Sequence, residues 1–129
     1  MEKIKLQIEK EIRDTGYSIS YRASLTGRVS WVKKTCAMPE IKSRKSLYIA
    51  LHELGHIVNG CVRPVYVSEF LAEMYAHQRM RELGFRVPQS MTERAKRYVR
   101  SKIIRAERRG ARSIDPKVRQ WTNLLAINC

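Results

Sequence analysis

A chain of 129 residues with 43% hydrophobic content is long enough to close one core without disulfide bonds. Three widely spaced cysteines without a CxxC pair exclude a disulfide framework and a cysteine zinc ribbon, and the lack of a signal peptide or an eighteen-residue apolar run predicts a cytoplasmic protein without a membrane segment. The net charge of +14 is concentrated in residues 91–129, which hold eleven basic and three acidic residues and favour polyanions or acidic proteins as neighbours.

The first third of the chain is predicted to form one helix and two strands. Isoleucines recur every four positions in residues 2–15, which indicates an amphipathic helix that ends at Gly16. Residues 17–23 alternate between apolar and polar, and residues 28–38 have a β-rich composition, so we expect two paired, antiparallel strands. Because proline lacks an amide hydrogen, Pro39 should end the second strand or place it at a sheet edge.

Two helices are predicted in the middle of the chain. The first is capped by Ser43 or Ser46, carries a broad apolar face at helical spacing and ends near Gly60. The second runs from Ser68, its expected cap, to the residue before Gly84.

The last third is predicted to contain a basic helix over residues 91–109 and a short helix that begins near Pro116. Small and aliphatic residues of the basic helix share one stripe by which it should dock, namely Ala95, Val99, Ile103 and Ala106. Trp121 and the pair Leu124–Leu125 are expected to be core contacts that fold the tail back.

The central motif is His52-Glu53-Leu54-Gly55-His56, and it falls within a predicted helix. Residues four apart lie on one helix face, so both imidazoles can reach one zinc ion while Glu53 flanks the metal-bound water. Zinc lowers the pKa of that water and polarises a peptide carbonyl, and the glutamate accepts the proton and later passes it to the leaving amine. The spacing therefore predicts peptide hydrolysis without a covalent intermediate.

A catalytic zinc site needs a third protein ligand, which the next helix can supply. Glu69 and Glu73 lie one turn apart on one face, so Glu69 could bind the metal while Glu73 orients a ligating histidine through its far nitrogen. Helix-face geometry favours Glu69, with Glu73 and then His77 as alternatives. If Glu69 is the ligand, His77 lies about 80° around the helix from Glu69. It would then be a surface residue or a hydrogen-bond donor to the transition state.

The motif, followed by Glu69, Ala72, Glu73, Tyr75 and Ala76, resembles the ImmA/IrrE metallopeptidases and, more broadly, the thermolysin-type gluzincins. The resemblance covers residues 47–80. It implies a zincin-like fold, Zn²⁺ as cofactor and Glu69 as third ligand. It further implies that Glu73 accepts a hydrogen bond from the far nitrogen of a ligating histidine. It also implies that substrate binds as an added strand along a sheet edge, for which residues 29–38 are the candidate, although the same run would serve equally as an ordinary protected edge.

The outer face of the basic helix has two interpretations. Its arginines could contact the phosphates of DNA or RNA, or they could form a solvated face that keeps the protein soluble. The sequence leaves both open for Arg94, Arg97, Arg100, Arg105 and Arg108.

Together these patterns predict an α+β fold in which a small antiparallel or mixed sheet packs on an active-site helix and a second ligand helix, followed by C-terminal basic helices. Residues 1–90 are expected to form a minimal zincin-like catalytic domain, and residues 91–129 a basic helical extension packed on it. The predicted function is zinc-dependent hydrolysis of peptide bonds in an intracellular protein. The alternative is a basic nucleic-acid-binding protein whose metal site is structural or vestigial.

Overall fold

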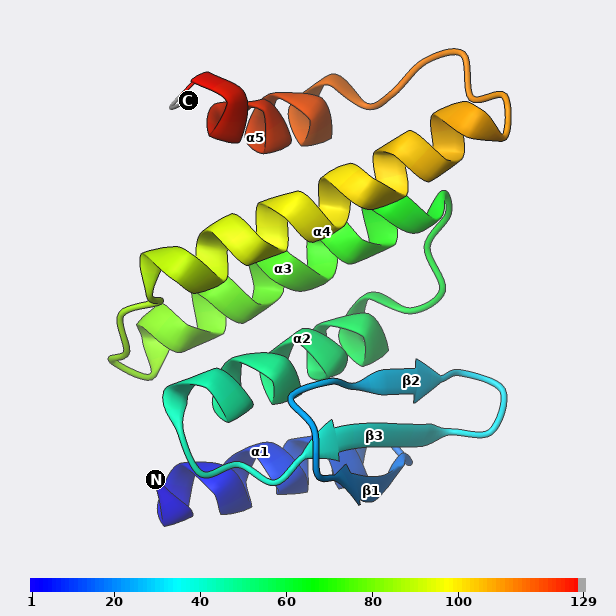
Figure 1. The fold of residues 1–129 in the computed structure, drawn as a ribbon. Coiled ribbons are helices and arrows are strands. Elements are labelled where there is room, and N and C mark those ends of the chain that lie inside the picture. The colour runs from blue at the N-terminus through cyan, green and yellow to red at the C-terminus, as the bar shows by residue number, and fades with distance from the viewer. Residues whose placement is uncertain (128–129) are drawn as a thin grey trace.

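The computed structural model describes the backbone of residues 1–127 and the side chains of residues 1–123, and within this part it is an α+β fold of five helices and a three-stranded mixed sheet. The sheet and the N-terminal helix form one end of the molecule, and the remaining helices follow it in successive layers, so the N-terminus and the last helix lie at opposite ends (Figure 1). In chain order the elements are α1 (Glu2–Asp14), β1 (Ser18–Arg22), β2 (Arg28–Ser30), β3 (Thr35–Pro39), α2 (Arg44–Asn59), α3 (Val65–Glu82), α4 (Gln89–Arg108) and α5 (Pro116–Ile127).

The sheet differs from the expected antiparallel pair. Residues 28–38 form two strands, because the chain turns at residues 31–34, where Lys34 has a positive φ of 56°. Strand β3 lies between the other two, parallel to β1 and antiparallel to β2. Pro39 ends β3, as expected, but β3 is the central strand, so β1 and β2 are the edges and only the β2 part of residues 29–38 lies at an edge.

One face of the sheet supplies the first hydrophobic cluster. The paired residues Ile19, Cys36 and Val29 share this face, together with Met38 two positions further along β3. They pack with buried aliphatic side chains of α1 and α2, including Ile8, Ile12, Leu47, Leu51 and Leu54. A fully buried side chain of this size contributes about 1.5–3 kcal/mol, so this cluster fixes α2 against the sheet.

Helix α2 begins and ends where the sequence predicts. Ser43 is its N-cap and accepts a hydrogen bond from the amide of Ser46, while the hydroxyl of Ser46 accepts one from the amide of Ser43 at 2.9 Å. Both candidate serines therefore form one reciprocal cap. At the other end Gly60 adopts a positive φ of 73°.

Helix α3 begins three residues earlier than expected, directly after Pro64. Ser68 is therefore a buried residue inside the helix and not its cap. The helix approaches α2 closely at Gly55, where a Cβ atom would lie 3.1 Å from Cα of Ala72. This close approach brings the motif of α2 against the first turns of α3.

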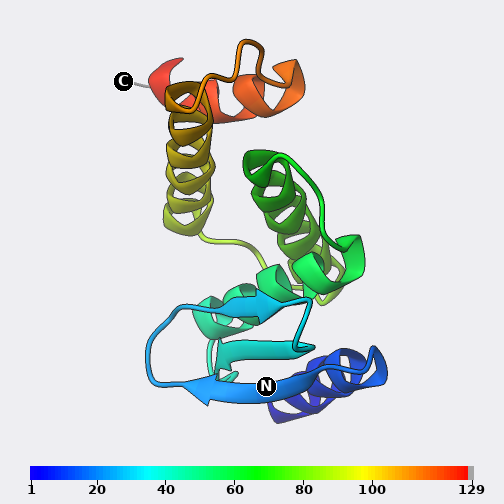
Figure 2. The same ribbon diagram turned by 90° about the vertical axis from the view of Figure 1, so that its right-hand side faces the viewer.

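Helix α4 lies beside α3, and α5 lies against α4 at the far end of the molecule (Figure 2). Side chains of these three helices form a second hydrophobic cluster. Three residues of the predicted stripe, Ala95, Val99 and Ile103, are buried, and Ala106 is half-buried, so docking by this stripe is confirmed. Trp121 packs edge to face on Phe70 with 5.4 Å between ring centroids, as expected of a core contact. The side chains of Leu124 and Leu125 lie outside the described residues. No helix of the described chain is long and apolar enough to cross a membrane.

Candidate metal centre

Two helices bring three potential metal ligands to one point. Nε2 of His52 lies 3.1 Å from Nε2 of His56, and Oε2 of Glu69 lies 3.3 Å and 3.0 Å from these two atoms. In a tetrahedral zinc site with bonds of about 2.0–2.1 Å, neighbouring ligand atoms are about 3.3 Å apart. The three side chains therefore match the donor type and the spacing of one face of such a tetrahedron.

The regular geometry of α2 and the position of α3 explain this convergence. The histidines lie one turn apart on α2, so their rings project from the same face. Glu69 lies in the second turn of α3, on the part of that helix that Gly55 allows to approach α2. The hydroxyl of Ser68 lies 3.3 Å from Nδ1 of His56, and the indole of Trp31 donates to the carbonyl of His56 at 3.1 Å.

A buried polar network lies behind the histidines. Oε1 of Glu73 is 2.6 Å from Nδ1 of His52, and the hydroxyl of Tyr48 donates to the other oxygen of Glu73. Tyr48 also lies 3.0 Å from Nδ1 of His77, whose Nε2 lies 2.9 Å from the hydroxyl of Thr92. The structure thus brings Glu69, and not Glu73 or His77, to the far nitrogens of the two histidines.

The expectation that His77 lies on the surface is wrong. Its side chain is buried because the N-terminal part of α4 covers it, and its ring packs edge to face on Tyr48 at 5.2 Å. His77 therefore links the polar side chains behind the histidine pair to α4.

The centre has an excess of carboxylates. Burial lowers the pKa of His52, but the neighbouring Glu69 and Glu73 outweigh it and raise this pKa to about 10. Burial opposes ionisation of Glu69 as well, but the two imidazoles hold its pKa far below the usual range. Three glutamates, including Glu53, thus surround two histidines. A divalent cation would offset this excess of negative charge.

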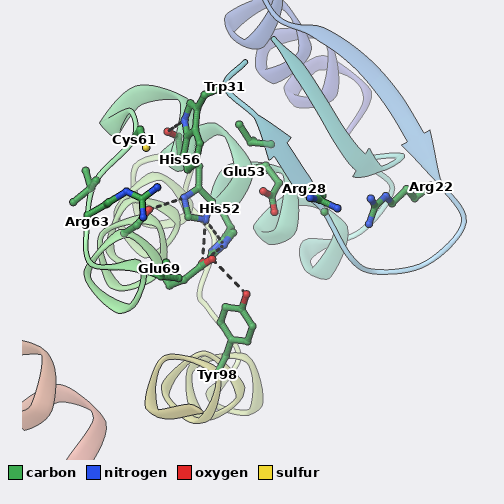
Figure 3. A pocket seen from close by; sticks show the side chains of 15 residues that line it. Arg22, Arg28, Trp31, His52, Glu53, His56, Cys61, Arg63, Glu69 and Tyr98 are labelled. Carbon is green, nitrogen blue, oxygen red and sulfur yellow. Dashed lines mark hydrogen bonds and ion pairs between the residues drawn. The ribbon is translucent and has the colours of Figure 1, made fainter. Parts of the chain in front are cut away.

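The front of the centre opens into a cleft of about 490 Å³ lined by Glu53, the two histidines and Glu69 (Figure 3). Burial, more than any neighbouring charge, raises the pKa of Glu53, which suits a group that takes up protons. Gly27 covers this carboxylate, since a Cβ atom there would lie only 2.6 Å from Oε2 of Glu53. A second cleft, of about 290 Å³, also contains Gly27, His52 and Glu53.

Comparison with protein-family models, curated proteins and solved structures found no match to this chain. Its chemistry is therefore inferred from its own residues.

Two residues of the centre carry no signal in the sequence. Gly27 belongs to the loop between β1 and β2, and the hydroxyl of Tyr98, on α4, donates to Oε1 of Glu69 at 3.4 Å (Figure 3). Both are distant from the motif along the chain, and neither belongs to a recognisable pattern. For Gly27 the only feature that could have suggested this position is the loop before β2. For Tyr98 it is the apolar stripe of α4.

The five arginines predicted on the outer face of α4 have different environments. Arg94 lines the second cleft, whereas Arg100 donates to the carbonyl of Thr122 at 2.6 Å and is half-buried. The remaining three, Arg97, Arg105 and Arg108, are exposed.

Proposed function

We propose that this chain is a zinc-dependent metallopeptidase in which His52, His56 and Glu69 bind the ion and Glu53 is the general base. The observation that carries the proposal is the convergence of three ligand atoms, 3.0–3.3 Å apart, at the floor of an open cleft that also contains Glu53. A structural zinc site would instead be closed by a fourth protein ligand. No fourth histidine, cysteine or acidic side chain joins this group among the described residues.

The chemistry divides between the ion and the side chains. Bound zinc supplies a water of lowered pKa and polarises the peptide carbonyl. Glu53 accepts a proton from the attacking water and passes it to the nitrogen of the leaving amine. Glu73 holds the ring of His52 so that its far nitrogen remains directed at the ligand site.

The proposal is tested by zinc content and by a Glu53→Gln variant. The purified chain should contain one zinc ion, and it should cleave members of a random peptide library, as read by mass spectrometry. Glu53→Gln keeps the size of the side chain but removes the base, so zinc should remain while cleavage falls by at least about 100-fold.

The matched control is Glu2→Gln, because Glu2 is exposed at the start of α1, far from the centre. It should cleave at the rate of the unmodified chain. A chain without stoichiometric zinc, or a Glu53→Gln variant with undiminished cleavage, would refute the proposal.

A further inference from the structure

Arginines lie on both sides of the histidine pair in the clefts. Arg63, from the loop between α2 and α3, lies on one side, and Arg22 and Arg28, from β1 and β2, lie on the other (Figure 3). Arg94 lines the second cleft, which continues past Glu53 and Tyr98. The clefts are therefore positively charged at both ends, with the metal centre between.

None of these four arginines forms an ion pair with a side chain in residues 1–123. Arginines in other parts of the fold do: Arg79 binds both carboxylate oxygens of Glu11 at 2.8 Å, and Arg119 binds Glu107 at 2.9 Å. The only carboxylates that line the first cleft within this part of the chain are Glu53 and Glu69, and both belong to the metal centre. The guanidinium groups at the ends of the cleft are thus available to a ligand.

We propose that the cleft binds peptides that carry aspartate or glutamate on both sides of the bond to be cut. This inference rests on the proposed peptidase function and names the class of its substrate. Guanidinium groups bind carboxylates through paired, parallel hydrogen bonds, and a concave site of one charge sign concentrates ligands of the opposite sign. A neutral peptide bond lies over the centre, while acidic side chains on either side reach the arginines.

The pattern of charges along the cleft favours a peptide over a nucleic acid. Glu53 and Glu69 lie between the arginines, and with zinc bound their two negative charges offset those of the ion, so the cleft is positive at its ends and close to neutral at its centre. A nucleic-acid strand carries a charge on every phosphate and would place some of them at this near-neutral centre, away from the arginines. A peptide, in contrast, can leave uncharged residues at that point.

Helix α4 extends the basic surface beyond the second cleft. At 100° per residue, Arg97, Arg105 and Arg108 fall with Arg94 within an arc of about 80° on the helix surface. All four are exposed, and Arg94 is the member that lines the cleft. An acidic segment that leaves the second cleft would follow this row along α4.

The test measures binding separately from cleavage. Two fluorescent peptides share one uncharged central sequence and differ only in their flanks, which contain glutamate in one and glutamine in the other. Their affinity for the zinc-loaded Glu53→Gln chain is measured by fluorescence anisotropy at several salt concentrations. The glutamate peptide should bind at least about tenfold more tightly, and the difference should decrease with salt.

A double variant then locates the preference. Arg28→Gln with Arg63→Gln should weaken binding of the glutamate peptide about 2- to 30-fold and leave the glutamine peptide unchanged. The control is Arg81→Gln with Arg112→Gln, which removes the same charge from two exposed arginines that line neither cleft, and it should keep the preference.

Equal binding of the two peptides, or a preference that Arg28→Gln with Arg63→Gln leaves at its full size, would overturn the inference. So would a single-stranded oligonucleotide of equal charge that binds more tightly than the glutamate peptide and is weakened by the same variant. Cleavage of both peptides by the unmodified chain is measured in parallel. Cleavage without a binding preference removes the inference alone, whereas a preference in a chain that cleaves neither these peptides nor any member of the random library removes the proposed function and leaves the acidic-peptide site.

Discussion

Behind the histidine pair the polar side chains are buried and bonded to one another, whereas in front of it they face open clefts. On the buried side Glu73, Tyr48 and His77 lie at 9% exposure or less and connect α2, α3 and α4. On the open side Tyr98 is 41% exposed, and the arginines of the cleft have no ion-pair partner in residues 1–123. The buried side can therefore hold the proposed ligands in place, while the open side leaves its groups available to the proposed substrate.

Substitution of a proposed zinc ligand, which lies between the two sides, should give the largest effect. Glu69→Ala removes one of three donors, so zinc affinity should fall by more than about 100-fold, beyond the range expected for loss of an outer partner. Competition with a chelator of known affinity measures this. Glu82→Ala, near the exposed end of the same helix, is the control and should bind zinc as the unmodified chain does. If Glu69→Ala kept its zinc, Glu69 would not be the third ligand, and Glu73 and His77 would remain as the alternatives.

On the open side the sharpest change is Gly27→Ala. The added methyl would lie 2.6 Å from Cγ and Oε2 of Glu53, so the carboxylate must move away from its position. A misplacement of about 1 Å can cost about 100-fold in rate, so kcat should fall by that order while zinc content is retained. Ser24→Ala, in the same loop but at an exposed position, is the control. Unchanged kcat in Gly27→Ala would mean that Glu53 does not act from this position.

The difference between the two sides also explains what the sequence could predict. The convergence of His52, His56 and Glu69 could be predicted because it depends on helical spacing within α2 and on the next helix along the chain. Gly27 and Tyr98 reach the centre from distant segments, and nothing local marks their approach. Contacts of this kind depend on how elements pack, which periodicity does not encode.

The fold follows the same division. The boundaries of α2 were predicted because capping serines and a terminal glycine act locally. The parallel pairing of β1 with β3 was missed because residues 31–34 contain no glycine or proline to mark a turn. The burial of His77 could not be predicted because nothing in α3 indicates that α4 will cover it.

On the buried side Glu73→Gln should have an intermediate effect. The change keeps the shape of the side chain but removes the charge that faces Nδ1 of His52. Loss of such an outer partner lowers metal affinity by about 10- to 100-fold, so zinc binding should weaken less than in Glu69→Ala. The same chelator competition measures both. A larger loss in Glu73→Gln than in Glu69→Ala would reverse the roles of the two glutamates.

The smallest effects should come from removal of one tyrosine hydroxyl on the buried side and one on the open side. Tyr48→Phe removes a hydroxyl that donates to buried Glu73, so the carboxylate loses a partner that water cannot readily replace. The free energy of unfolding should fall by about 1–3 kcal/mol, as measured by urea denaturation. Tyr98→Phe removes a long hydrogen bond to Glu69 at the edge of a cleft, where water can take its place, so the change should stay within about 0.5 kcal/mol. Equal losses of unfolding free energy in the two variants would show that the buried hydrogen bonds stabilise the protein no more than those at the cleft. The two sides would then differ only in where they lie.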